Sequence, residues 1–365
     1  MAAAKQTTLY NRHLENNGHM VSFAGYLLPS YYTSINREHA VVRENAGLFD
    51  VSHMGEFIVS GNDSSIFMQK MTVNDVFSLI PGQAQYSAMC YENGGLVDDL
   101  LIYKRDESYL LVVNAANIEK DLNWLVSNID GQVFIEDVSD KIELIALQGP
   151  KARVILQPLI DSDLRDLSFY HFIDGQVMGC KAMISRTGYT GELGYEIYAH
   201  PQYIVQIWDS IMESGVKYGI KPVGIGSRDT LRMEMKYSLY GIDIDENTNP
   251  IEAGLGWVVK MGDGNFLGKD AIRESMKNLS RRLVCLKMTE RAIPRNGCRI
   301  LINDDVVGYI TSGTMSPSLQ KGIGIGYVNM PFAKTGTELK VDIRGKQKSA
   351  EIVKAPFYQQ GSLLD

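Results

Sequence analysis

The chain has 365 residues, 45% hydrophobic and 22% charged, and its 36 basic and 43 acidic side chains leave a net charge of −7. This composition is typical of soluble globular proteins and excludes a disordered or collagen-like chain, and the length suits two or three domains. The negative charge argues against a general nucleic-acid or membrane-surface binder, because such proteins usually carry a basic excess.

Signals for targeting and for metal binding are lacking along the chain. No apolar run reaches the roughly 20 residues of a membrane span, and residues 1–19 contain no apolar core of a secretory signal. The six histidines are dispersed, and the four cysteines form no C-x-x-C pair. We therefore expect free thiols in a reducing compartment, a cytoplasmic protein and no bound metal.

Strand and helix signals alternate from Gly55 onwards. A short apolar strand is predicted at Glu56–Ser60, followed by a helix that carries Phe67 and Met71. Three strands follow, joined by segments with the composition of hairpin turns, at Ala84–Tyr91, Leu96–Lys104 and Tyr109–Asn114. Asn117 is then expected to be the N-cap of a further helix.

A similar order returns downstream. Ile142–Leu147 is a predicted strand, and Pro150 favours the start of a helix. Two strands flank a glycine-rich turn at Thr187–Gly194, and a helix opens at Pro201. The repetition predicts an α+β domain over residues 1–278, with antiparallel sheets, helices and two pseudo-repeated halves at about 50–135 and 136–245.

The last part of the chain differs. From about Arg282 only short strands are predicted, including two hairpins and a strand with glycines at 322, 324 and 326. Tyr327 stands where a dinucleotide-binding motif needs its third glycine, so we interpret this run as a strand of small residues. These features predict a C-terminal β-barrel over residues 279–365, giving a three-lobed molecule, with Arg273–Arg282 as the linker helix.

Asp98 and Asp99 interrupt an otherwise apolar predicted strand, where aspartate is uncommon. Because adjacent strand residues face opposite sides, at most one of the two carboxylates can face a given cavity. Either both cap the hairpin, or one of them directs its carboxylate at a nitrogen of a ligand.

Three further charged residues have two readings each. Arg228 and Arg232 lie one helical turn apart, and they either pair with neighbouring acids or bind an anionic ligand. Glu196 lies inside an apolar strand, where a buried carboxylate needs hydrogen-bond donors that a ligand ring could supply. A lone His53 is more often structural than catalytic, and Met54 is core by default.

The segments together resemble the aminomethyltransferase (T-protein) family of the glycine cleavage system. Each match is weak alone, but nine of them follow in family order from Thr7 to Tyr358. The matching stretches are Asp50–Glu56, Gly94–Leu100, Val113–Asn117, Ala146–Pro150, Ser185–Glu196, Ser227–Arg232, Leu239–Gly241, Thr248–Gly254 and Pro356–Tyr358. Because Thr7–Tyr10 already resembles the start of the family, we expect no mitochondrial presequence.

The resemblance implies a duplicated folate-binding α+β core followed by a β-barrel. It also implies transfer of the methylene carbon from the aminomethyl-dihydrolipoyl arm of the H-protein to tetrahydrofolate, with release of ammonia. Tetrahydrofolate and the lipoylated H-protein are thus the expected partners. The flat pterin, rich in N–H donors, suits carboxylates and aromatic walls, and the anionic tail suits arginine.

Residue by residue, Asp99 matches the key carboxylate of the family, which orients the pterin and polarises or deprotonates the attacking folate nitrogen. Arg228 matches an arginine that faces the folate. The remaining matches are the pterin contacts Asn114 and Glu196, the pocket walls Met54, Tyr86, Tyr103 and Tyr189, and the closing C-terminal aromatic Tyr358. The chain departs from the family pattern at Tyr26, Leu193 and Ser227, none of which coincides with the matched carboxylates or arginine.

Two other functions are compatible with this fold. The first is a folate-dependent demethylase that acts on a small methylated compound, although such relatives tend to depart from the motifs at Asp50–Glu56 and around Asp99. The second is a non-enzymatic folate-binding protein, but those relatives carry a cysteine in the turn that corresponds to Thr187–Glu192, where this chain has none.

Overall fold

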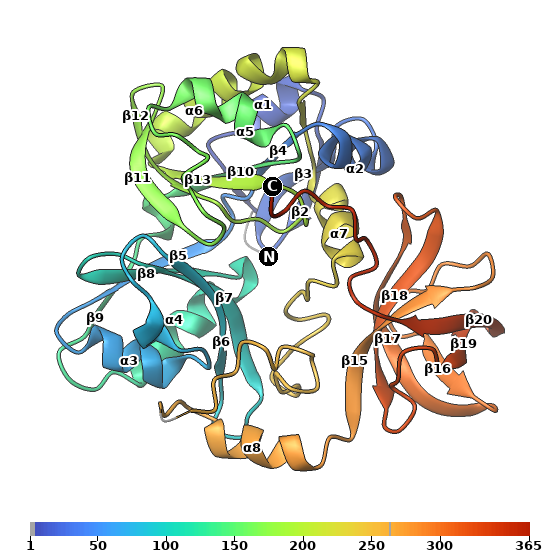
Figure 1. Cartoon of the computed structure of the whole chain (residues 1–365). Coiled ribbons are helices and arrows are strands. Elements are labelled where there is room, and N and C mark those ends of the chain that lie inside the picture. The colour runs from blue at the N-terminus through green and yellow to red at the C-terminus, as the bar shows by residue number, and fades with distance from the viewer. Residues whose placement is uncertain (1–3, 263) are drawn as a thin grey trace.

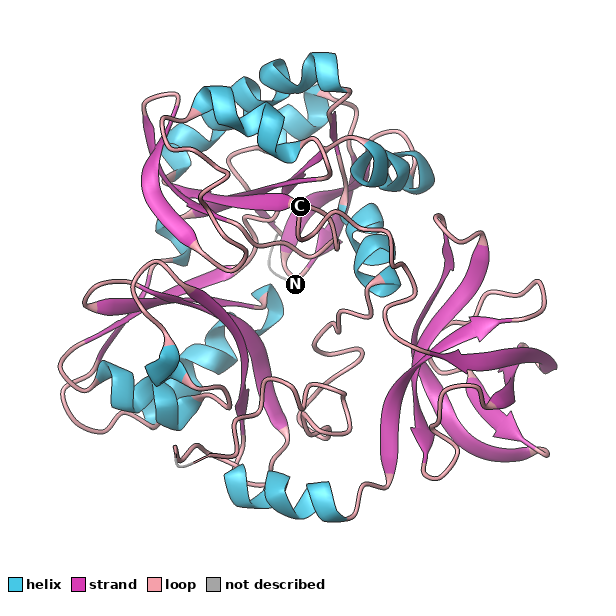
Figure 2. Cartoon of the chain, in the orientation of Figure 1, coloured by secondary structure: helices cyan, strands magenta, loops and turns pink. Residues whose placement is uncertain are grey.

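The molecule has three lobes arranged around a common centre (Figure 1). The structure, a computed structural model, describes residues 4–262 and 264–365, so the first three residues of the predicted first domain lie outside it. Two lobes combine sheets with helices and the third is a closed barrel made of strands (Figure 2). The predicted α+β fold with a C-terminal barrel is therefore confirmed.

The first lobe is a five-stranded antiparallel sheet with helices packed on one face. Its strands, in the order β6-β7-β8-β5-β9, are Ala84–Cys90, Leu96–Lys104, Ser108–Val113, Gly55–Ser60 and Phe134–Asp137. Helices α3 (Ser64–Met71) and α4 (Ile118–Ser127) cover the sheet, because their apolar stripes, including Phe67 and Leu125, bury against Phe57 and Leu111.

The second lobe is a six-stranded sheet covered by helices, and the buried Trp208 belongs to its hydrophobic core. Its strands, in the order β11-β12-β13-β10-β4-β14, are Phe172–Val177, Cys180–Ser185, Gly194–Ala199, Glu143–Gln148, Gly47–Asp50 and Lys221–Pro222. Helices α5 (Ala152–Leu156) and α6 (Pro201–Gly215) pack on it, and Pro201 occupies the first turn of α6 as predicted.

The internal duplication is visible in the strand order. The run β6-β7-β8-β5 of the first sheet matches β11-β12-β13-β10 of the second, and both follow the chain order strand, helix, three strands, helix. The two sheets differ in the strand that pairs with the outer side of β5 or β10. In the first sheet β9 pairs with β5. In the second sheet β4, which precedes the first repeat in the chain, pairs with β10.

The chain before the repeats forms helices α1 (Tyr10–Glu15) and α2 (Ile35–Glu44) and a small sheet. Its strands, in the order β1-β3-β2, are Lys5–Gln6, Tyr26–Tyr31 and His19–Phe23. After the second repeat, helix α7 (Ile225–Glu234) lies between the second lobe and the barrel (Figure 1).

The linker helix lies earlier than the stretch Arg273–Arg282 predicts. Helix α8 runs over Lys269–Lys277, and its buried Ile272 anchors it to the first lobe. Arg281 and Arg282 belong to the first barrel strand, because they pair with Asn329 and Val328. Polarity alone cannot separate a helix end from a strand start.

The barrel closes in the order β15-β18-β17-β16-β19-β20. These strands are Arg281–Met288, Lys321–Asn329, Asp305–Ser316, Arg299–Ile302, Glu338–Ile343 and Lys346–Val353. Leu339 and Val341 point into the core while Lys340 is exposed, as their alternation predicts. A Cβ atom on Gly326 would lie 2.5 Å from the carbonyl oxygen of Tyr309, so the glycine-rich run is a strand that needs small residues.

Candidate functional site

A cavity of about 890 Å³ lies where the three lobes meet. Its wall combines the central strands of the first sheet, the glycine-rich turn before β13, helix α7, residues 235–240 and the barrel strands β15 and β20. Cavities of this size hold cofactor-sized ligands. The walls are mostly aromatic and aliphatic, with a few charged groups among them.

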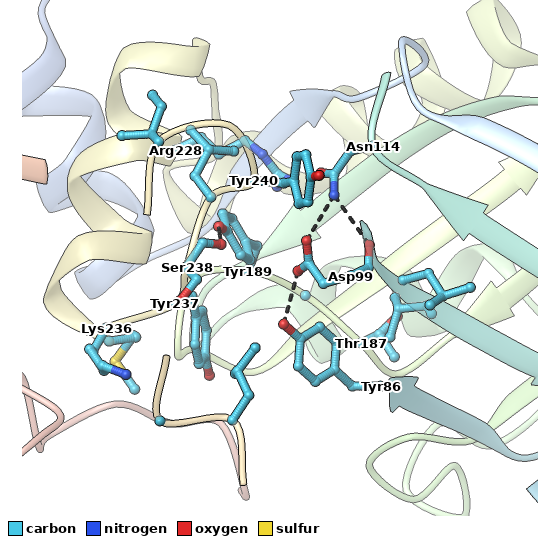
Figure 3. A pocket seen from close by; sticks show the side chains of 18 of the residues that line it. Tyr86, Asp99, Asn114, Thr187, Tyr189, Arg228, Lys236, Tyr237, Ser238 and Tyr240 are labelled. Atoms are coloured by element: carbon cyan, nitrogen blue, oxygen red, sulfur yellow. Dashed lines mark hydrogen bonds between the residues drawn. The ribbon is translucent and has the colours of Figure 1, made fainter. Parts of the chain in front are cut away.

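The carboxyl group of Asp99 projects into this cavity from β7. Tyr86 donates its hydroxyl to Asp99 Oδ2 at 2.9 Å, and Asn114 donates its side-chain amide to Oδ1 at 2.9 Å, so the two hold the carboxyl from different sides (Figure 3). Asp98 is fully buried on the opposite face of the strand. One carboxylate of the pair faces the cavity, and neither caps the hairpin.

The environment of Asp99 shifts its protonation. Burial, with a smaller contribution from the negative charge of Asp98, raises the pKa of Asp99 to about 7, although the hydrogen bonds from Tyr86 and Asn114 oppose this shift. A carboxyl group with such a pKa exchanges its proton near neutral pH, which is the property of an efficient general acid or base.

Glu196 lies in β13 and is buried, as predicted. Thr187 donates its hydroxyl to Glu196 Oε2 at 2.5 Å, and Thr187 is in turn hydrogen-bonded to Ser185 at 2.9 Å. Burial raises the pKa of Glu196, while the hydrogen bond from Thr187 and the positive charge of Arg228 lower it. The carboxyl group lines the cavity and is available to N–H donors of a ligand.

The two arginines of α7 have different surroundings. The structure therefore decides, for each of them, between pairing with neighbouring acids and binding a ligand. Arg232 is buried in ion pairs with Asp243 at 2.5 Å and Asp229 at 2.8 Å, so its role is structural. Arg228 lines the cavity and its guanidinium makes no hydrogen bond to any residue that the structure describes. It lies 4.5 Å from the centre of the Tyr189 ring, ready to bind an anionic or carbonyl group.

Aromatic side chains form two walls of the cavity. Tyr189 stacks on Tyr237, with ring centres 5.5 Å apart, and Tyr86 stacks on Trp257 at 5.8 Å. Tyr189 also donates its hydroxyl to the carbonyl of Ser238, which ties the glycine-rich turn to residues 235–240. Met54 lines the same cavity. A flat ligand can therefore be held between ring faces.

Two of the residues matched by resemblance lie away from the cavity wall. Tyr103 is fully buried in the core between the two sheets, where its hydroxyl is 2.9 Å from that of Tyr198. Tyr358 covers the guanidinium of Arg43, whose carbon lies 4.0 Å from the ring centre, and its backbone N–H donates to the carbonyl of Glu234. Both therefore support the residues around the cavity rather than line it.

Several lining residues are missing from the sequence-based candidates. His53 lines the cavity with Nδ1 unpaired among the described residues, and burial and the charge of Arg228 lower its pKa to about 4, so it is neutral. Tyr237, Ser238 and Trp257 come from a segment of irregular backbone whose path no periodicity reveals. The family-matching stretch Leu239–Gly241, which directly follows Tyr237 and Ser238, is the sequence feature nearest to these two residues.

Among residues 4–262 and 264–365, no group of three or more His, Cys, Asp and Glu side chains is placed to hold a metal ion. In the same part of the chain, the helices are too short or too polar to cross a membrane. The four cysteines are free thiols, and three of them are buried.

Known proteins match the chain along nearly all of its length. The family model described as "GCVT N-terminal domain" matches residues 9–263, and "Glycine cleavage T-protein C-terminal barrel domain" matches residues 281–359. The chain is 49% identical to an aminomethyltransferase of Chloroherpeton thalassium, covering 97% of the chain and 98% of the relative. It is 48% identical to one of Bacillus subtilis, covering 98% of the chain and 99% of the relative.

A solved structure has the same fold over all three lobes. The crystal structure of the glycine cleavage system aminomethyltransferase T from Bartonella henselae superposes with a TM-score of 0.91 at 31% sequence identity. The match covers 98% of this chain and 99% of that one.

Proposed function

Since the chain belongs to the aminomethyltransferase (T-protein) family of the glycine cleavage system, we propose that the cavity between its lobes binds tetrahydrofolate. The enzyme transfers the methylene carbon of an aminomethyl group, which the dihydrolipoyl arm of the H-protein carries, to this folate, and ammonia is released. The observation that carries the assignment of the site is the carboxyl group of Asp99, held by two donors inside an aromatic-walled cavity.

The residues that line the cavity suit a reduced pterin. Glu196 and Asp99 offer carboxylates to ring N–H groups from two sides, and the ring lies against Tyr189 and Tyr86. Asn114 and Met54 complete this part of the wall. Arg228, which has no partner among the described residues, faces the carbonyl or the anionic groups of the folate.

Asp99 has the chemical role in this proposal. When ionised, it takes a proton from, or polarises, the folate nitrogen that attacks the methylene carbon, and its pKa near 7 lets it return that proton. The cavity would hold the two reactants close together, and this proximity supplies the rest of the acceleration.

Partners and location follow from the same assignment. We propose that the lipoylated H-protein presents its arm to this cavity. The free cysteines agree with a reducing compartment such as the cytoplasm.

The test is tetrahydrofolate-dependent release of ammonia from aminomethylated H-protein by the purified chain. We expect Asp99→Ala to lose at least about 100-fold in kcat, since a positioned acid–base group contributes about 10²–10⁴-fold. Asp106→Ala is the matched control, because Asp106 is exposed in the turn after the same strand. Full activity of Asp99→Ala would remove the role given to Asp99, and faster turnover of small methylated compounds than of H-protein would favour a demethylase.

A further inference from the structure

A chain of buried hydroxyl groups runs behind the cavity wall and ends on Glu196. Thr187 donates its hydroxyl to Glu196 Oε2 at 2.5 Å. The Thr187 oxygen also lies 2.9 Å from the hydroxyl of Ser185 and 3.3 Å from that of Tyr103. The hydroxyl of Tyr103 lies in turn 2.9 Å from that of Tyr198. All five side chains are buried, and they connect β7 of the first sheet with β12 and β13 of the second.

The direction of these hydrogen bonds follows from the number of protons. A hydroxyl group has one proton to donate and two lone pairs that accept. Since Thr187 gives its proton to Glu196, it can only accept from Ser185 and Tyr103. Tyr103 then gives its proton to Thr187, so it accepts from Tyr198. All protons of the chain therefore point towards the carboxyl group, and each hydrogen bond polarises the next.

Only one of the two carboxyl oxygens of Glu196 is held by this chain. No described residue donates a hydrogen bond to Oε1, and Glu196 lines the cavity. Burial raises the pKa of Glu196, whereas the hydrogen bond from Thr187 and the positive charge of Arg228 lower it. The hydroxyl of Thr187 thus fixes the orientation of the carboxyl group and favours its ionised form.

We propose that Thr187 is a positioning residue for folate binding: its hydroxyl, oriented by Tyr103, holds one carboxyl oxygen of Glu196 so that the other faces an N–H group of the pterin. The proposal rests on the proposed function, which places the pterin in this cavity. It also gives a role to Tyr103, which is fully buried and lies outside the cavity wall.

Other charged and titratable groups lie around Glu196 on the neighbouring elements. They are Arg228 on α7, Tyr103 on β7, Tyr198 on β13 and Tyr170 before β11. Burial raises the pKa of each of these tyrosines, so none ionises near pH 7, and arginine stays charged there. Asp99 titrates in the same cavity, but it is common to all variants of Thr187. A difference between these variants in the pH dependence of folate binding therefore reports on Glu196.

The experiment measures the dissociation constant of tetrahydrofolate by anaerobic calorimetry across pH 5 to 8. Thr187→Val keeps the shape of the side chain and removes the hydroxyl. We expect its dissociation constant to rise about 10-fold, since a hydrogen bond to a charged group is lost, while kcat at saturating folate changes little. The acidic limb of binding should move to higher pH, because the ionised form of Glu196 loses a donor. Thr187→Ser keeps the donor and should bind as the unmodified enzyme does.

A second variant keeps the proposal testable if Thr187→Val does not fold. Tyr103→Phe removes a hydroxyl from a ring outside the cavity wall, so it can affect the ligand only through the hydroxyl chain. We expect the dissociation constant to rise about threefold. Tyr109→Phe is the matched control, because Tyr109 is also buried in the first sheet but donates to Ser65, at 2.8 Å, and lies outside the cavity wall.

Equal dissociation constants of a folded Thr187→Val and the unmodified enzyme would overturn the proposal. Equal weakening by Thr187→Val and Thr187→Ser, or by Tyr103→Phe and Tyr109→Phe, would overturn it as well. Glu196→Gln separates such a failure from a failure of the proposed function. If Glu196→Gln binds tetrahydrofolate as tightly as the unmodified enzyme, the proposed pterin site is itself wrong. If Glu196→Gln weakens binding and Thr187→Val does not, only the role of Thr187 is wrong.

Discussion

At the scale of single residues, the site depends on two neighbours on one strand that face opposite ways. Alternation along β7 sends Asp99 to the cavity and Asp98 to the interior, and the interior charge helps to keep the cavity carboxyl group protonated up to about pH 7. In the proposed function, the same amino acid thus serves as the reacting group at one position, while its neighbour lies buried on the other face of the strand.

The ionisation of Asp99 should be visible in stability as well as in activity. Because burial raises its pKa to about 7, the folded protein binds a proton more tightly than the unfolded chain, so this contribution to stability is lost as pH rises towards 7. We expect Asp99→Asn, which cannot ionise, to gain more in Tm relative to the unmodified enzyme at pH 8 than at pH 5, while losing activity. A Tm difference independent of pH, in thermal melts across that range, would contradict the raised pKa.

Arg228 offers a second test at this scale. A charged hydrogen bond contributes about 1.5–3 kcal/mol, so Arg228→Gln should raise the KM for tetrahydrofolate roughly 10- to 100-fold. Steady-state kinetics with Arg295→Gln, an exposed barrel residue, gives the control. An unchanged KM in Arg228→Gln would mean that the guanidinium faces no group of the folate.

At the scale of elements, the glycine-rich turn before β13 is shaped by one buried side chain. Gln148 of β10 donates to the carbonyl of Thr187 at 3.1 Å and accepts the hydroxyl of Thr190 at 2.8 Å. A Cβ atom on Gly188 would lie 2.0 Å from Gln148 Oε1, and one on Gly194 would lie 2.2 Å from Nε2. The glycines make room for Gln148, which in turn fixes the turn that presents Tyr189.

Gly194→Ala should therefore displace Gln148 and loosen the turn. We expect a loss of about 1–3 kcal/mol in the free energy of unfolding, the usual cost of overpacking, together with a higher KM for tetrahydrofolate. Gly175→Ala in β11 is the matched control, because its Cβ atom would lie 3.7 Å from the nearest side chain. Chemical denaturation measures the free energy of unfolding of both variants. Equal values would show that the Gln148 side chain moves aside without destabilising the protein.

At the scale of the whole molecule, helix α7 connects the barrel to the rest of the chain. Arg232 forms an ion pair with Asp243 and donates a hydrogen bond to Ser312 of the barrel at 3.0 Å. Asp243 also accepts a hydrogen bond from the hydroxyl of Thr311 at 2.6 Å. Glu234, at the end of the same helix, accepts the hydroxyl of Ser316 at 2.5 Å. This buried polar junction holds the barrel against the cavity.

Breaking the junction should destabilise the molecule more than any surface pair does. Removing one partner of a buried ion pair costs about 3–5 kcal/mol, so Asp243→Ala should lose that much stability in denaturant unfolding. Asp163→Ala removes one partner of an exposed pair with Arg165 and should leave the stability nearly unchanged, because solvent screens such a pair. Similar losses in both variants would show that the barrel is held by apolar contacts instead.

Local pattern was sufficient to predict most elements. The strand at Leu96–Lys104 has the predicted bounds, and the helix predicted after Asn117 begins at Ile118. The function of the Asn117 side chain was not predicted, because its amide donates to Asp98 instead of capping the helix. A capping preference is local, whereas a buried carboxylate 19 positions away competes for the same donor only in the folded chain.

The sequence by itself determined the fold class, the duplication, the barrel and the aspartate pair, since periodicity and turn composition act over a few neighbouring residues. Only the tertiary structure decided which arginine is paired and that Tyr103 lies between the sheets behind the wall. These outcomes depend on contacts between lobes, and burial there sets both the protonation and the partners of each charged group.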